Sequence, residues 1–213
     1  MRILLALVMF TLAIRAMGNV EYVDWAAYDT TSTVKTQVIT TSDTLLNHTK
    51  VNFGVPYKPW IIDTNGPIRV EAEHYNGGGK MVGYYDTSAG NLGGKYRQDD
   101  VDIQQCYDVG GGYDVAWFGM NEWLNYSLSV TTPGWYVVKF RVANYLKTQG
   151  ALIEITVNNR NTRGAYKVPV TGGSQKWKTF AIQDVFLPSG NITLTIRSNS
   201  GGFSINWFEI ESQ

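Results

Sequence analysis

The stretch "NITLTIR", residues 191–197, alternates apolar and polar side chains without a break. Ile192, Leu194 and Ile196 fall on one side of an extended chain, and the polar residues between them fall on the other. Because successive side chains of a β-strand point to opposite faces, this period of two predicts a strand with one buried face. The same pattern recurs in "WYVVKFRV" (135–142) and "ALIEITV" (151–157).

Turn-forming residues separate these predicted strands from one another. Glycine pairs stand at 93–94, 172–173 and 201–202, and no long window repeats with the period of a helix. Short strands bounded by Gly, Asn and Asp at this spacing are typical of a β-sandwich or a β-barrel. We therefore predict an all-β domain over residues 67–213.

Composition restricts the class of partner. The chain has 213 residues, 44% hydrophobic and 17% charged, which suffices for one main domain and an extension. Its 18 basic and 18 acidic side chains cancel, and no basic run alternates with aromatic residues. Nucleic acid is therefore not an expected partner, whereas 13 tyrosines and 7 tryptophans suit an all-β binding protein.

The amino terminus, "MRILLALVMFTLAIRAMGN", has the pattern of a secretory signal peptide over residues 1–18. A basic Arg2 precedes an apolar run, and the small residues Ala16 and Gly18 flank Met17. An uncleaved anchor is the alternative, because Arg15 interrupts the pattern. We predict a secreted, extracellular protein that does not contact a membrane after cleavage. Residues 19–66, rich in Thr, Ser and Pro, are predicted to be a weakly structured extension and linker.

Cys106 is the one cysteine of the chain, so the domain has no internal disulfide. Its stability must come from the core or from a bound ion. We predict that Cys106 is a buried small hydrophobe rather than a reactive thiol.

The chemistry that the residues support centres on carboxylates. The chain has no nucleophile elbow, no His-Glu-x-x-His and no phosphate-binding loop. In "IRVEAEHY" (68–75), Glu71 and Glu73 stand two positions apart in a predicted strand, which places both on one face. The pair suits an acid–base couple of a glycosidase, two oxygen ligands of Ca²⁺, or plain surface charge.

Aromatic rings offer a second chemistry, because the C–H faces of sugars stack on exposed Tyr or Trp. Tyr96 and Trp177 follow glycine turns and are the better candidates for a binding surface. Trp117, Trp123 and Trp135 have apolar neighbours and are predicted to be buried.

Six blocks in order resemble family 6 carbohydrate-binding modules over about residues 67–211: "IRVEAEHY", "GYYDTSAGNLGGKYRQDDVDI", "GMNEWLNYSLSV", "GWYVVKFRVAN", "TGGSQKWKTF" and "GGFSINWFEI". The resemblance implies a two-sheet antiparallel β-sandwich of the jelly-roll type, which follows the poorly structured N-terminal extension. It also implies a module that binds a polysaccharide or oligosaccharide and catalyses nothing, of a kind usually joined to glycoside hydrolases; this chain is expected to act beside separate ones. A structural Ca²⁺ is implied as well, with ligands from Glu71, Glu73, the carbonyl of Lys95 or a neighbour, and Asn206.

The resemblance further implies two places for the sugar. At the loop end, Tyr96 matches one aromatic wall, Ser174 stands where the family has a stacking Trp, and Ser204 stands where it has an Asn. Trp177 is a possible substitute for the missing wall. On a concave sheet face, Glu122 matches a family Glu.

Three functions follow, and the first is the leading hypothesis. The protein is a secreted, non-catalytic carbohydrate-binding module with lectin-like properties and a structural calcium. Alternatively it is a small glycoside hydrolase that uses Glu71 with Glu73, or Glu122. The third alternative is a structural or adhesive extracellular protein that has lost sugar binding.

Overall fold

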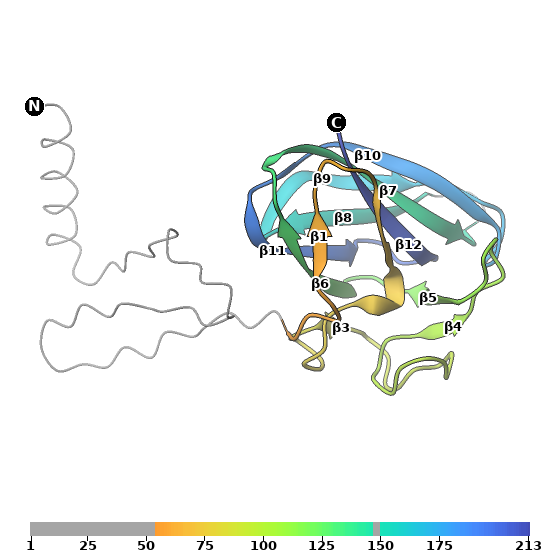
Figure 1. The fold of residues 1–213 in the computed structure, drawn as a ribbon. Helices are drawn as coiled ribbons and strands as arrows, with labels where there is room; N and C mark the ends of the chain where they lie inside the picture. The colour runs from red at the N-terminus through yellow and green to blue at the C-terminus, as the bar shows by residue number, and fades with distance from the viewer. Residues whose placement is uncertain (1–53, 147–149) are drawn as a thin grey trace, which may run out of the picture. The chain divides into compact units, whose positions relative to one another are not determined.

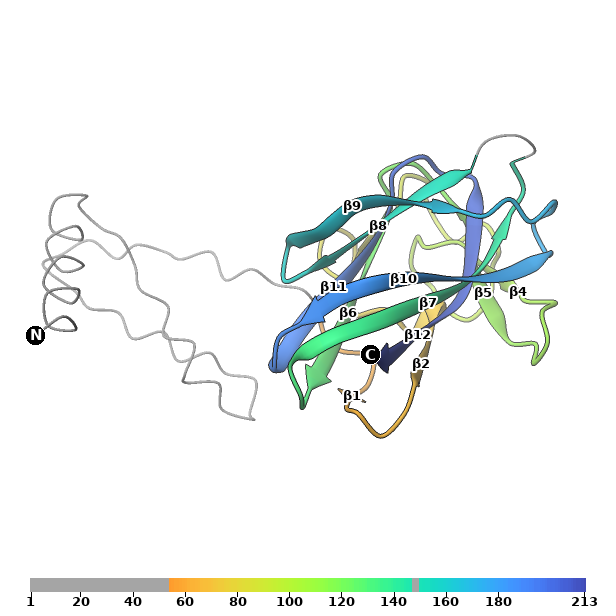
Figure 2. The same ribbon diagram turned by 90° about the horizontal axis from the view of Figure 1, so that it is seen from above.

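The computed structural model describes residues 54–146 and 150–213. Two sheets lie against each other as a β-sandwich, with β10 and β7 side by side in both views (Figure 1, Figure 2). Apart from one parallel strand pair, the named strands pair antiparallel. This confirms the predicted all-β, two-sheet antiparallel sandwich. The predicted signal peptide and most of the predicted extension lie outside the described residues.

The first sheet has the order β1-β6-β11-β8-β9, and β3 pairs with β6. Its strands are β1 (Trp60–Ile62), β3 (Tyr84–Tyr85), β6 (Trp123–Val130), β8 (Ala151–Val157), β9 (Arg160–Val168) and β11 (Gly190–Ser198). The second sheet has the order β10-β7-β12-β5-β4, and β2 pairs with β12. Its strands are β2 (Ile68–Glu71), β4 (Ile103–Gln105), β5 (Tyr113–Phe118), β7 (Gly134–Asn144), β10 (Trp177–Leu187) and β12 (Phe203–Ser212).

The alternating stretches form strands whose apolar faces are buried, as predicted. Ile192, Leu194 and Ile196 are buried in β11, and the same holds for the alternate apolar residues of β7 and β8. Aromatic rings from both sheets meet between them, with the Tyr126 and Phe208 centroids 4.8 Å apart. Cys106 is buried, which confirms the prediction for this residue.

The sandwich begins earlier than residue 67. Strand β1 pairs in parallel with β6, and the Thr131 amide donates to the Ile62 carbonyl at 2.9 Å. Trp60 and Ile62 lie in the core, 8% and 0% exposed. The predicted boundary was too late because the flanking prolines of this segment indicate a linker, while a three-residue edge strand leaves little periodicity to detect.

The helical content of the described residues is one short 3₁₀ turn, η1 (Ala72–His74). No helix in residues 54–146 and 150–213 has the length and apolarity needed to cross a membrane.

Candidate functional site

Tyr96 occupies a strained position in the loop between β3 and β4. Its φ is +62°, in the left-handed region that side-chain-bearing residues rarely adopt. The Arg97 amide donates to the Lys95 carbonyl at 2.7 Å, so Tyr96 is the central residue of a tight three-residue turn. Strained conformations of this kind persist only where the surrounding structure holds them, and they concentrate at functional sites.

Three aromatic side chains hold the Tyr96 ring. The Tyr96 hydroxyl lies 2.8 Å from Nε2 of His74 and also hydrogen-bonds the hydroxyl of Tyr57. The Tyr113 ring packs on the Tyr96 ring with centroids 5.1 Å apart. Burial of the hydroxyl, together with its bond to Tyr57, raises the pKa of Tyr96, so the phenol stays neutral. The side chain is nevertheless 42% exposed, so part of a fixed aromatic ring faces solvent.

The loop that carries Ser174 is tied to the strand beside Tyr96. Gln175 Nε2 donates to Asp114 Oδ1 at 3.1 Å, and Asp114 follows Tyr113 on β5. Gln175 Oε1 accepts from the Tyr107 amide at 2.9 Å and from Trp177 Nε1 at 3.3 Å. Ser174 and Trp177 are both partly exposed. Gln175 therefore links the loop of Ser174 and Trp177 to Asp114, the chain neighbour of the Tyr113 whose ring packs on Tyr96.

Ser204 and Glu122 do not present polar atoms to a ligand. Ser204 is 0% exposed and its hydroxyl has no hydrogen-bond partner, so it cannot contact a sugar at the surface. Glu122 is 5% exposed. Its Oε1 accepts from the Thr87 amide at 3.0 Å and from the Thr87 hydroxyl at 2.5 Å, and its Oε2 accepts from the Gly119 amide at 2.5 Å. One oxygen therefore fastens the β5–β6 turn and the other fastens the loop after β3, which is a structural role.

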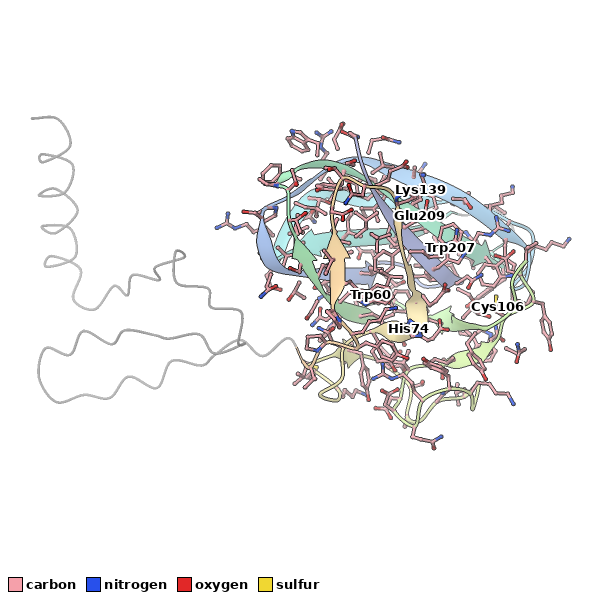
Figure 3. All side chains as sticks on the ribbon, in the orientation of Figure 1. Trp60, His74, Cys106, Lys139, Trp207 and Glu209 are labelled. Atoms are coloured by element: carbon pink, nitrogen blue, oxygen red, sulfur yellow. The ribbon has the colours of Figure 1, made fainter. Side chains whose placement is uncertain are left out.

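Glu71 and Glu73 are not on one strand face, contrary to the sequence-based interpretation. Strand β2 ends at Glu71, and Glu73 lies in η1. Glu73 is 4% exposed, and its Oε2 is buried without a hydrogen-bond partner. Burial raises the pKa of Glu73 to about 8, with smaller contributions from the negative charges of Glu71 and Asp114. Figure 3 shows His74, the residue after Glu73, beside the Trp60 side chain.

The other two predicted calcium ligands, Asn206 and the Lys95 carbonyl, differ in whether their oxygen atom already accepts hydrogen bonds. Asn206 is 3% exposed, and its Nδ2 donates to Asp108 Oδ2 at 3.0 Å. That bond turns the amide nitrogen toward Asp108 and leaves the amide oxygen for another partner. The Lys95 carbonyl already accepts from Asn91 Nδ2 at 2.8 Å and from Arg97. Among the described residues, no three His, Cys, Asp or Glu side chains form a metal-binding group.

The family model described as carbohydrate binding module (family 6) matches residues 95–212, more than half of the chain. The chain belongs to this family. The family 6 module is 31% identical over 117 residues to the clotting factor G alpha subunit of Tachypleus tridentatus, covering 54% of this chain and 17% of that protein's length.

Solved structures with the same fold include modules of two polysaccharide-degrading enzymes. One is the C-terminal family 6 module of a laminarinase from Zobellia galactanivorans, with 25% identity and a TM-score of 0.52 over 68% of this chain and 99% of that one. The other is a module of lichenase 5A from Cellvibrio mixtus in complex with cellotriose, with 23% identity and a TM-score of 0.52 over 68% and 97%.

Sequence reasoning missed several side chains of this family 6 module's candidate site. Tyr57, His74 and Tyr113 contact Tyr96, and Gln175 links its loop to β5. No periodic pattern marks Tyr57, which is 39 residues from Tyr96. Gln175 stands beside Ser174 in "TGGSQKW", where an amide side chain next to two glycines is the one available signal.

Proposed function

We propose that this family 6 module is a secreted, non-catalytic protein that binds a glycan at the surface around Tyr96. The observation that carries the proposal is the partly exposed Tyr96 ring, held in a strained turn by His74, Tyr57 and Tyr113. A preorganised ring loses little conformational entropy when a sugar stacks on it, so a larger part of the stacking energy appears as affinity.

The loop of residues 171–177 offers no second aromatic wall, so binding should be weaker than between two facing aromatic rings. Ser174 has no ring, and the indole nitrogen of Trp177 is bonded to Gln175. Loss of one aromatic wall, on the scale of about 1 to 3 kcal/mol for burying a large side chain, lowers affinity roughly tenfold to a hundredfold. We therefore propose a weak site that relies on Tyr96 for stacking and on polar groups of the 171–177 loop for hydrogen bonds.

The proposed ligand is a β-linked glucan. A module from Bacillus halodurans with the same fold, 22% identical, is named as binding β-1,3-glucan, and the lichenase module holds cellotriose. The two β-glucans share an equatorial, flat pyranose face, which suits a single tyrosine platform. We further propose that the protein acts beside separate glycoside hydrolases, because the module of the laminarinase is part of an enzyme that attacks such a polymer.

We also propose a structural Ca²⁺ held by Glu71, Glu73 and Asn206, with a carbonyl from the loop near Lys95. The support is the buried Oε2 of Glu73, which lacks a partner, and the orientation of the Asn206 amide. Ca²⁺ prefers carboxylate and amide oxygens, and it would neutralise the adjacent negative charges. Because the Lys95 carbonyl already accepts two hydrogen bonds, a neighbouring carbonyl is the better fourth ligand.

Hydrolysis is not the proposed function, although Glu73 has the raised pKa of a general acid. A general acid must reach the glycosidic oxygen, and Glu73 is almost completely buried. Both oxygens of Glu122 accept hydrogen bonds from the protein's own backbone, one from Thr87 and one from Gly119. Secretion is proposed from the signal-peptide pattern of residues 1–18.

The proposed function is tested by retention of the full chain on immobilised polysaccharides. We expect saturable retention on a β-1,3-glucan or on cellulose, and no release of reducing sugar during long incubation. Absence of retention on β-1,3-glucan, β-1,4-glucan and xylan would favour the adhesive alternative, and release of reducing ends would favour the hydrolase.

A further inference from the structure

We propose that residues 54–58, the segment before β1, form part of the sugar site, with Tyr57 as the residue that positions the Tyr96 ring. This inference rests on the proposed function and adds a residue to its site. Tyr57 lies outside the blocks that resemble the family and outside the matched residues 95–212.

Tyr57 contacts both the Tyr96 hydroxyl and the histidine that supports it. Its ring stacks on His74 with centroids 4.1 Å apart and planes 8° from parallel. Its hydroxyl hydrogen-bonds the Tyr96 hydroxyl, to which His74 Nε2 is also bonded at 2.8 Å. The three side chains therefore form a closed set of contacts, in which the Tyr96 hydroxyl is held from two directions.

The segment that carries Tyr57 is anchored on both sides. Before it, Val55 and Gly77 exchange two backbone hydrogen bonds of 2.9 and 2.7 Å. After it, Trp60 is buried in the core, and the Lys58 ammonium lies 3.9 Å from the centre of the Trp60 ring. Tyr57 is thus fixed between two attachment points.

The first attachment point requires a glycine. Gly54 has a φ of +90°, and a Cβ atom added there would lie 2.1 Å from the Gly77 carbonyl oxygen. Such a distance is far inside a van der Waals contact, so only glycine allows the chain to approach Gly77 this closely. The glycine at position 54 therefore allows this segment to pack against Gly77, in the loop that follows η1.

Positioning by Tyr57 has a clear physical use. The tight turn that places Tyr96 at a φ of +62° is unfavourable by itself, so contacts elsewhere must hold it. The Tyr57 and Tyr96 side chains are similarly exposed, at 43% and 42%, so both rings contribute to one solvent-facing aromatic surface. A chain of β-linked glucose units would therefore stack on a Tyr96 ring that the hydrogen bond to Tyr57 already holds in one orientation.

The test replaces the Tyr57 hydroxyl and keeps its ring. In the full chain, Tyr57→Phe preserves the stack on His74 and removes the bond to Tyr96, so we expect affinity for a β-1,3-glucan tetrasaccharide to fall about twofold to tenfold. The melting temperature should stay within about 1 °C of the wild type, since the bond is exposed and neutral. Tyr166→Phe is the matched control, because the Tyr166 hydroxyl has no hydrogen-bond partner, and its affinity should be unchanged.

A double-mutant cycle separates positioning from a general effect on the fold. In a Tyr96→Phe background the hydroxyl pair is already absent, so Tyr57→Phe should have no further effect on affinity. An additive effect in that background would overturn the inference. Wild-type affinity in Tyr57→Phe, combined with a loss in Tyr96→Ala, would refute the role of Tyr57 and leave the proposed function standing. Unchanged affinity in Tyr96→Ala would refute the proposed site itself.

Discussion

Replacing Tyr96 by alanine is expected to lower the affinity for a β-1,3-glucan oligosaccharide about tenfold to a hundredfold, measured by isothermal titration calorimetry. The ring is the one stacking platform at the site that is both partly exposed and held by three aromatic neighbours. Alanine is preferable to glycine here. Like tyrosine, alanine is strained at a positive φ, so the substitution removes the ring, whereas glycine would also relax the backbone.

Trp135→Ala is the control for this substitution. Trp135 is more exposed than Tyr96, at 51%, and packs on Phe186 at the β10 edge of the second sheet, whereas the Tyr96 loop contacts β4 at the other edge. Its loss should leave affinity within about twofold of the wild type. A larger loss of affinity in Trp135→Ala than in Tyr96→Ala would place the sugar at the β10 edge of the second sheet and contradict a site at Tyr96.

The second large effect is on stability and depends on pH and calcium. Without metal, the pKa of Glu73 is about 8 in the folded protein, against an ordinary value of 4.5. Between these values the folded state keeps a proton that the unfolded state has lost, so the free energy of unfolding should fall as the pH rises from 5 to 8. At roughly 1.4 kcal/mol for each pH unit, the decrease over these three units is at most about 4 kcal/mol, and it is measured by urea unfolding with a chelator present.

Calcium should offset part of this loss at the upper end of the pH range. The ion binds the ionised carboxylate, so at pH 8 a hundredfold excess over its Kd should raise stability by about 2.7 kcal/mol and Tm by about 5 to 10 °C. At pH 5 the increase should be smaller, since the Glu73 proton competes with the ion.

Two glutamate variants check the assignment. Glu73→Gln should remove most of the pH dependence between pH 7 and 8 and weaken the response to calcium, because a neutral amide has no proton to lose and is a weaker ligand. The fall below that range should remain, since burial also raises the pKa of Asp86 and of Asp114 to about 6. Glu211→Gln should retain both, because Glu211 lies on the surface and pairs with Lys139. An unchanged Tm on addition of calcium at pH 8 would contradict the metal site.

The strands were predictable from the sequence because burial acts on every second residue along most of β7 and all of β8. In β11 the polar Thr193 and Thr195 are buried as well as the apolar residues between which they stand, so the alternation there predicts the strand but not its exposed face. Apolar neighbours in the sequence were less reliable for predicting whether a single tryptophan is buried. Trp117 and Trp135 are 39% and 51% exposed although both were predicted to be buried. In a half-buried strand, neighbours in the sequence point to the opposite face, so their apolarity says little about the residue between them.

The candidate site was predictable only in part. Tyr96 was found from its position after a glycine turn, and the structure places it on the surface. Ser204 and Glu122 were named from a resemblance, and the structure buries both. Which face a side chain takes at a turn or bulge depends on tertiary contacts, such as the Gly119 and Thr87 donors of Glu122, and these do not appear in local spacing.

The most direct test of a glucan site at Tyr96 is an NMR titration of the full chain with a β-1,3-glucan tetrasaccharide, followed through backbone amide shifts. We predict saturable shifts that centre on Tyr96, extend to Tyr57, Tyr113 and Gln175, and are absent in Tyr96→Ala. Shifts that centre instead on Trp123 and Tyr85, whose stacked rings lie on the first sheet, or no shifts at millimolar sugar, would contradict the account.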